Sequence, residues 1–149
     1  MPAKYSSSGQ TMLEMVIVLG LIGTVLVALV GIVTVSVRNS NFTRDEAGAT
    51  RYAQEAMEWV RQERDKNWTN FYAKVGYMYC INTPTPVWPS SAGACLVGSR
   101  FGSASYWREV TLTNVGLSGD PRNKVDVAVY WQDSKGIHSS TTTTTLTRW

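Results

Sequence analysis

The stretch that decides the fold begins at residue 9 and reads Gly9-Gln-Thr-Met-Leu-Glu-Met-Val-Ile-Val-Leu-Gly-Leu-Ile-Gly23. Its single acid, Glu14, stands directly before residues 15–37, which contain no charged side chain. At about 1.5 Å per residue, a helix over these residues crosses the roughly 30 Å hydrocarbon core of a bilayer. We therefore predict that residues 15–37 form a membrane span.

Glu14 is unusual at the head of such a segment, because an isolated ion in hydrocarbon costs about 2.5 to 3.5 kcal/mol. Two interpretations remain open from the residues alone. Glu14 lies at the headgroup level, where an acid near a helix N-terminus interacts favourably with the helix dipole. Alternatively, it has an oppositely charged partner, since an unpaired carboxylate in a medium of low dielectric constant is costly.

The length and net charge of the chain limit its possible organisation and function. Its 149 residues allow one globular domain plus an extension. The net charge of +3 is too small and too dispersed to indicate a nucleic-acid-binding protein. A cleavable secretory signal is not favoured, because the apolar run is long and no Ala-x-Ala motif follows it.

The positive charges and the cysteines give opposing indications of the side of the membrane on which the C-terminal part lies. Lys4 alone precedes the span, whereas Arg38, Arg44 and Arg51 follow it, and this excess favours a cytoplasmic C-terminal part. The chain has only two cysteines, Cys80 and Cys95, in its C-terminal part. A lone pair in a small domain predicts a disulfide and an oxidising compartment; two free thiols are the alternative.

A helix is expected to continue beyond the span, because no proline occurs between residues 3 and 83. We predict one helix from about residue 11 to residue 66, with an amphipathic second half over residues 38–66. Its apolar stripe is made by Ala49, Ala53, Ala56 and Val60, widened by Tyr52 and Met57. On the other side, Glu58 with Arg61, and Arg61 with Asp65, stand at ion-pair spacing.

The C-terminal third alternates apolar and polar residues and predicts strands over residues 107–114, 124–132 and 137–149. Residues 116–123 read as a turn, and residues 133–136 as a hairpin loop. The five threonines of residues 141–145 suit a strand better than a mucin-like tract, because no proline interrupts them. Residues 67–106 read as loop. The expected fold class is α+β, a long helix packed on a small antiparallel sheet.

No residues combine into a catalytic or cofactor site, so we expect a protein that is not an enzyme and has no metal or other cofactor. The single histidine, His138, is expected to be an ordinary strand residue. The acids Asp120, Asp126 and Asp133 lack calcium-loop spacing. Two tryptophans, Trp88 and Trp107, are able to stack on a sugar, although filling a small core is the favoured interpretation.

The N-terminus resembles the type IV pilin and type II secretion pseudopilin superfamily. A short leader, residues 1–9, ends in Gly9, a hydrophobic helix follows at once, and Glu14 stands five positions after the glycine. Residues 52–68 and the C-terminal hairpin, more loosely, look like those of minor members of the family. The resemblance implies cleavage by prepilin peptidase between Gly9 and Gln10, on the cytoplasmic side, and methylation of the new N-terminus at Gln10.

The resemblance also implies a role for Glu14, which in assembled filaments of the family pairs with the N-terminal amine of a neighbouring subunit. Here that amine belongs to Gln10, where the family most often has Phe. Many members carry a proline in mid-span, near Gly31 of this chain, and the helix loosens there in some filaments. Gly23 and Gly31 are expected to permit this, since glycine weakens a helix by about 1 kcal/mol relative to alanine.

The resemblance implies four parts: a leader (1–9), a transmembrane and filament-core helix (10–37), an amphipathic helix (38–66), and an extracytoplasmic head (67–149). The chain is then a minor pilin or pseudopilin, a structural subunit of a type IV pilus or a secretion pseudopilus. Its partners are prepilin peptidase, other subunits and the bacterial inner membrane, which it crosses once with the head outside. Export despite the arginines is feasible, because long domains translocate largely regardless of charge. The alternative is a membrane-anchored binding module, acting in adhesion or DNA uptake outside any filament.

Overall fold

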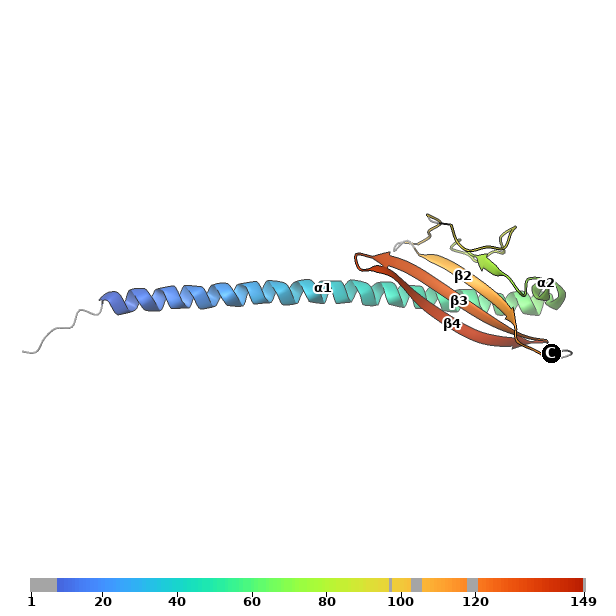
Figure 1. The fold of residues 1–149 in the computed structure, drawn as a ribbon, viewed down its shortest axis with the longest axis horizontal. Helices are drawn as coiled ribbons and strands as arrows, with labels where there is room; N and C mark the ends of the chain where they lie inside the picture. The colour runs from blue at the N-terminus through green and yellow to red at the C-terminus, as the bar shows by residue number, and fades with distance from the viewer. Residues whose placement is uncertain (1–7, 97, 103–105, 118–120, 149) are drawn as a thin grey trace, which may run out of the picture. The chain divides into compact units, whose positions relative to one another are not determined.

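A computed structural model describes residues 8–96, 98–102, 106–117 and 121–148, with side chains from residue 12 onward. The chain forms two compact units, Met1–Phe42 and Thr43–Trp149, and each is considered by itself. The elements are α1 (Ser8–Lys66), α2 (Trp68–Tyr72), β1 (Met78–Cys80), β2 (Trp107–Asn114), β3 (Arg122–Asp133) and β4 (Gly136–Thr147), as labelled in Figure 1. The α+β class predicted from the sequence is confirmed.

Helix α1 covers the whole stretch that lacks proline, and the predicted helix over residues 11–66 is therefore confirmed. Gly23, Gly31 and the polar residues 39–41 all remain helical. Its last turn carries Arg64 and Lys66, which interact favourably with the helix dipole at that end. The first part of α1 belongs to the N-terminal unit, and the part from Thr43 onward belongs to the C-terminal unit.

The sheet has the strand order β1-β2-β3-β4, and all neighbouring strands are antiparallel. Strands β3 and β4 pair from Arg122 opposite Thr147 to Asp133 opposite Gly136, so a two-residue loop joins them. The predicted hairpin loop is thus confirmed. Gly136 has φ 136°, a conformation that a side chain would strain.

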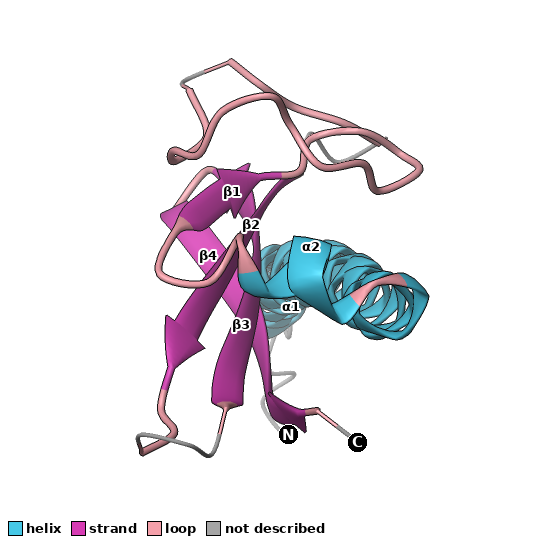
Figure 2. Ribbon diagram, turned by 90° about the vertical axis from the view of Figure 1, so that its right-hand side faces the viewer, coloured by secondary structure: helices cyan, strands magenta, loops and turns pink. Residues whose placement is uncertain are grey.

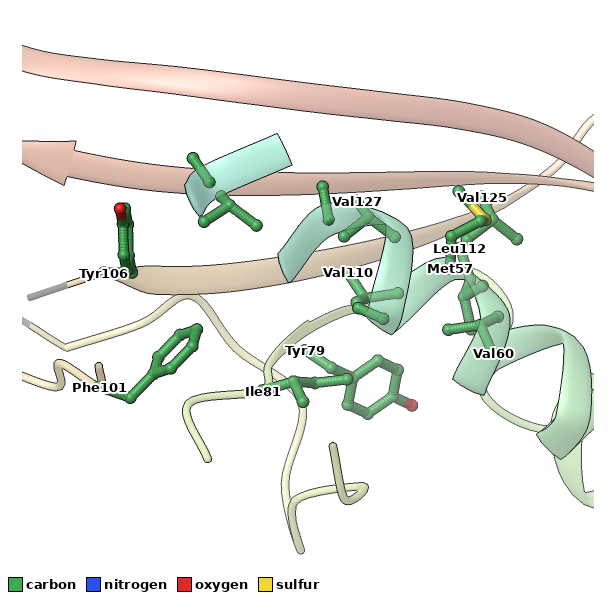
Figure 3. Close-up of a cluster of buried hydrophobic side chains, with 14 of the residues drawn as sticks. Met57, Val60, Tyr79, Ile81, Phe101, Tyr106, Val110, Leu112, Val125 and Val127 are labelled. Atoms are coloured by element: carbon green, nitrogen blue, oxygen red, sulfur yellow. The ribbon is translucent and has the colours of Figure 1, made fainter. Parts of the chain in front are cut away.

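The core of the C-terminal unit lies between one face of this sheet and the amphipathic half of α1 (Figure 2). The predicted stripe of Ala49, Ala53, Ala56 and Val60 is fully buried, and Met57 is almost so. The small alanines allow the helix backbone to approach the sheet closely. The facing side chains include Val110 and Leu112 from β2 and Val125 and Val127 from β3 (Figure 3). Val129 and Trp131 of β3 belong to the same buried cluster.

The structure corrects the loop assignment of residues 67–106. Helix α2 follows directly after α1, and Asn67 caps it by accepting a hydrogen bond from the Asn70 backbone at 2.9 Å. Strand β1 pairs with β2, so the sheet has four strands rather than the predicted three. Three residues are too few to show alternation, and for this reason β1 was not predicted.

Two smaller expectations are also wrong. The turn predicted over residues 116–123 extends too far, because Arg122 and Asn123 already belong to β3 and pair with β4. Arg61 forms an ion pair with Glu58, as expected, but not with Asp65, which pairs with Arg64 at 2.7 Å. The sequence places both acids within reach of Arg61, and spacing alone does not decide between them.

Gly48 of α1 lies against Tyr106, whose hydroxyl donates to the Asp45 carbonyl at 3.0 Å. A Cβ atom at position 48 would stand 2.3 Å from that hydroxyl oxygen. We expect Gly48→Ala to lower the free energy of unfolding by about 1 to 2 kcal/mol, because the displaced tyrosine outweighs the roughly 1 kcal/mol gain in helix propensity. Urea unfolding followed by fluorescence measures this change.

Adding Tyr106→Phe provides the control for Gly48→Ala, because it removes the oxygen that meets the new methyl group. The double variant is expected to recover stability relative to Gly48→Ala alone. A single Gly48→Ala variant more stable than the parent chain would show that Tyr106 moves aside without cost.

Candidate functional site

The first candidate site is the apolar surface of α1 in the N-terminal unit. Every described side chain from Met12 to Val37 is exposed, and the large apolar ones range from 44% exposed at Val18 to 75% at Val27. No face of the helix is shielded. By length and composition this helix is able to cross a membrane. The hydroxyls of Thr24 and Thr34 donate to carbonyls of the preceding turn, at 2.8 Å each, and so need no water.

Glu14 is the only charged residue on this surface, and its side chain is exposed. Among the described residues it forms no ion pair or hydrogen bond. Gly9 and Gln10 belong to the first turn of α1 by their backbone, and the side chain of Gln10 lies outside the described residues. Cleavage at Gly9, methylation of Gln10 and pairing of Glu14 therefore remain predictions, as does the location of Glu14 at a headgroup interface.

Gly23 and Gly31 lie inside α1 with no neighbouring atom near the position of a Cβ. Neither is required by a close contact within the chain, so a packing reason for glycine at these positions is not found in the described residues. Each lowers the local helix propensity by about 1 kcal/mol relative to alanine. Their role as points of helix flexibility stays a prediction.

The second candidate site is in the C-terminal unit, where Cys80 and Cys95 form a disulfide across a sequence separation of 15. This confirms the predicted bond and excludes the alternative of free thiols. A loop of this size contributes about 3 kcal/mol in the chain-entropy model. The Cys95 amide also donates to Glu109 of β2 at 2.9 Å, so the loop is attached to the sheet at two points.

Arg108 of β2 is fully buried. The sequence did not lead us to predict it as a core residue. Its guanidinium donates to the carbonyls of Tyr52 at 3.1 Å, Ile81 at 3.2 Å and Thr83 at 2.9 Å. Burial lowers the pKa of Arg108. The period-two alternation of β2 could have predicted this burial, because Arg108 shares the inward face of the strand with Val110 and Leu112. Arg108 connects the proline-containing loop to α1.

The two tryptophans singled out from the sequence have different environments. Trp88 packs against Trp59 and Tyr79, with ring centroids at 4.7 and 5.1 Å, which confirms its expected core position. Trp107 does not fill the core. It lies on the opposite face of the sheet, stacked on Tyr130 at 5.4 Å. The expectation for Trp107 is therefore wrong, because its place in β2 alternates with the buried Arg108.

His138 is the predicted strand residue, paired with Asp133 at 2.9 Å and stacked on Trp131. No group of three potential metal ligands occurs in the part of the chain that the structure describes, from which Asp120 is missing. Asp126 instead accepts a hydrogen bond from Thr143 at 2.6 Å and forms an ion pair with Lys124 at 2.9 Å.

The hairpin should make stability depend on pH. The hydrogen bond from His138 lowers the pKa of Asp133, and the Lys135 and Gly136 amides add to this effect. Such a carboxylate stabilises the fold above its unfolded pKa of about 3.9, and the contribution is lost as pH falls through the lower folded value. We expect the free energy of unfolding to fall less steeply below pH 4 in Asp133→Asn than in the parent chain. Urea titrations at several pH values measure this slope.

Glu46→Gln is the matched control for Asp133→Asn, since Glu46 is exposed and has no resolved interaction among the described residues. It should leave the acid slope unchanged. Equal slopes for Asp133→Asn and the parent chain would contradict the assigned role of the hairpin.

Comparison of the chain with protein-family models, with characterised proteins and with solved structures finds no match. The function is therefore argued from the residues of this chain. Two features carry the argument: an exposed apolar helix with one acid near its start, and a disulfide-bonded α+β head.

Proposed function

We propose that the chain is a minor pilin- or pseudopilin-like structural subunit. It is anchored by α1 in the bacterial inner membrane, with its C-terminal unit outside. Prepilin peptidase removes residues 1–9 by cleavage between Gly9 and Gln10. The mature subunit then joins other subunits through residues 10–37, in a type IV pilus or a type II secretion pseudopilus.

The observation that carries this proposal is the apolar surface of α1 with its single acid. A helix that is apolar on all sides requires lipid or a bundle of similar helices. The same chain meets both environments in the proposed cycle, first the membrane and then the filament core. The amine produced by cleavage supplies the charge that Glu14 lacks among the described residues.

The C-terminal unit supports the proposed orientation. Its disulfide is of the kind that persists in the periplasm or at the cell surface and is rare in the cytosol. Its core is formed between α1 and the sheet, so the helix that anchors the subunit also stabilises the head. A head built in this way suits a structural subunit.

The test is the intact mass of the chain purified from membranes of host cells that contain prepilin peptidase. We expect a mature N-terminus at Gln10 with one added methyl group. Gly9→Ala should leave the leader attached, whereas Ser7→Ala should be processed like the parent chain. A mature protein that begins at Met1, or one cleaved after residue 37, would overturn the proposal.

A further inference from the structure

A cavity of about 160 Å³ lies on the outer face of the sheet, away from α1. Its floor is formed where β2 begins, β3 ends and β4 begins, by Trp107, Gln132 and Ile137. Its wall is formed by residues near the disulfide, among them Cys95, Leu96 and Arg100. The volume suits one large apolar side chain, since an apolar cavity of about 150 Å³ is able to hold a benzene molecule.

The rim of the cavity is apolar and open to solvent. Leu96 is 80% exposed and Ile137 is 64% exposed. Elsewhere on this face, β4 presents mostly serine and threonine. Leu96 and Ile137 thus extend the apolar contact available to a partner beyond the cavity itself.

Arg100 supplies a cation at this place. Its guanidinium donates to Gln132 at 2.9 Å and lies 5.5 Å from the centre of the Trp107 ring. Among the described residues no carboxylate pairs with Arg100. Its other N–H groups are therefore available to an external acid, which arginine recognises through two parallel hydrogen bonds.

Glu109 of β2, an acid on the same face of the sheet as Trp107, is engaged elsewhere. It accepts a hydrogen bond from the Cys95 amide at 2.9 Å. Burial raises the pKa of Tyr130, and the negative charge of Glu109 and a hydrogen bond to it add to this effect. The disulfide and the hydrogen bond to Glu109 hold Cys95 on the sheet, and the hydrogen bond to Gln132 orients the guanidinium of Arg100. These groups are thus positioned before a partner binds, which lowers the entropy lost on binding.

We propose that this cavity docks a partner polypeptide, which inserts one large apolar side chain and places a neighbouring carboxylate on Arg100. A polypeptide fits better than a small free acid, because the exposed Leu96 and Ile137 offer contact area outside the cavity. The proposal requires a folded head only and does not depend on filament assembly.

The test uses the full chain in lipid nanodiscs and the resonance of the Trp107 indole N–H, assigned with Trp107→Phe. The probe is the blocked peptide Ac-Gly-Leu-Asp-Gly-NH2, and Ac-Gly-Leu-Asn-Gly-NH2 is its uncharged match. We expect a saturable shift with the Asp peptide and about tenfold weaker binding of the Asn peptide, which corresponds to loss of about 1.4 kcal/mol.

Arg100→Gln should abolish the preference for the Asp peptide, whereas Arg148→Gln, at an exposed cation outside the cavity, should preserve it. Leu96→Ser should weaken both peptides. Equal binding of the two peptides, or no saturable shift with either, would overturn the proposal. Binding of 3-methylbutanoate as tight as that of the Asp peptide would also overturn it, since the site would then take a free acid.

Discussion

Replacement of Arg108 by methionine is expected to lower the free energy of unfolding by about 4 kcal/mol. The fully buried guanidinium donates to the carbonyls of Tyr52, Ile81 and Thr83. Methionine fills most of the volume but donates nothing, so these hydrogen bonds are lost. Hydrogen bonds to charged groups contribute about 1.5 to 3 kcal/mol each, and such losses are partly offset by the desolvation that a buried cation requires.

Arg108→Lys separates charge from geometry. The lysine keeps the positive charge, but one ammonium group does not reach three carbonyls on α1 and on the proline-containing loop. We expect a loss of about 2 kcal/mol, intermediate between Arg108→Met and the parent chain. Urea unfolding of the full chain in detergent micelles, followed by tryptophan fluorescence, gives all three values.

The control for Arg108 is Arg148→Gln, which removes an exposed cation and should change stability by less than about 0.5 kcal/mol. Arg108→Met with the stability of the parent chain would show that the carbonyls find other partners. If Arg108→Lys has the same free energy of unfolding as the parent chain, the site requires the positive charge and not the three hydrogen bonds of the guanidinium.

Elements with a long and regular pattern were predictable from the sequence. The apolar stripe of α1 repeats over several turns, and Val125, Val127 and Val129 alternate over most of β3. Each pattern reports which face of an element is buried, and the buried strand residues that the structure describes share one face of the sheet. The pairing of α1 with that face follows, because no other apolar face of comparable size exists in the described part of the C-terminal unit.

Short elements and polar core residues were not predictable in this way. Strand β1 is held by its pairing with β2 and by the disulfide, which are contacts between residues far apart in sequence. Arg108 is polar by composition and buried by position. Residues of that strand were assigned to the core or the surface by their type rather than by their position in the alternation. For the same reason the apolar Trp107 was wrongly expected in the core. The carbonyls that accept from Arg108 belong to three separate segments, which no local pattern brings together.

For Glu14 the limit is of another kind, because its proposed partner is the amine of a different molecule. The structure of one chain shows that Glu14 is exposed and has no ion pair among the described residues. It does not contain the second subunit that would supply the amine. The choice between a paired carboxylate and a headgroup-level carboxylate therefore requires an experiment in which several chains compete for the same filament.

Glu14→Gln is expected to reduce incorporation into filaments more than tenfold when the variant and the parent chain are produced together. Glutamine keeps the shape of the side chain and removes its charge, so in the proposed filament the amine of a neighbour's Gln10 would be left unpaired in an apolar core. A lone charge in such surroundings costs about 2.5 to 3.5 kcal/mol, and even 1.4 kcal/mol is tenfold in an equilibrium. Mass spectrometry of sheared filaments measures the ratio of the two chains.

Two further variants make this result specific to the charge at position 14. Glu14→Asp keeps the charge on a shorter arm and should restore part of the incorporation. Glu46→Gln removes an exposed acid from the part of α1 that belongs to the C-terminal unit, and this variant should incorporate like the parent chain. Cleavage after Gly9 must remain complete in all of them, so that a processing defect is not mistaken for an assembly defect. If processed Glu14→Gln incorporates as well as the parent chain, Glu14 acts at the headgroup level, and the register of the filament must be set by other contacts.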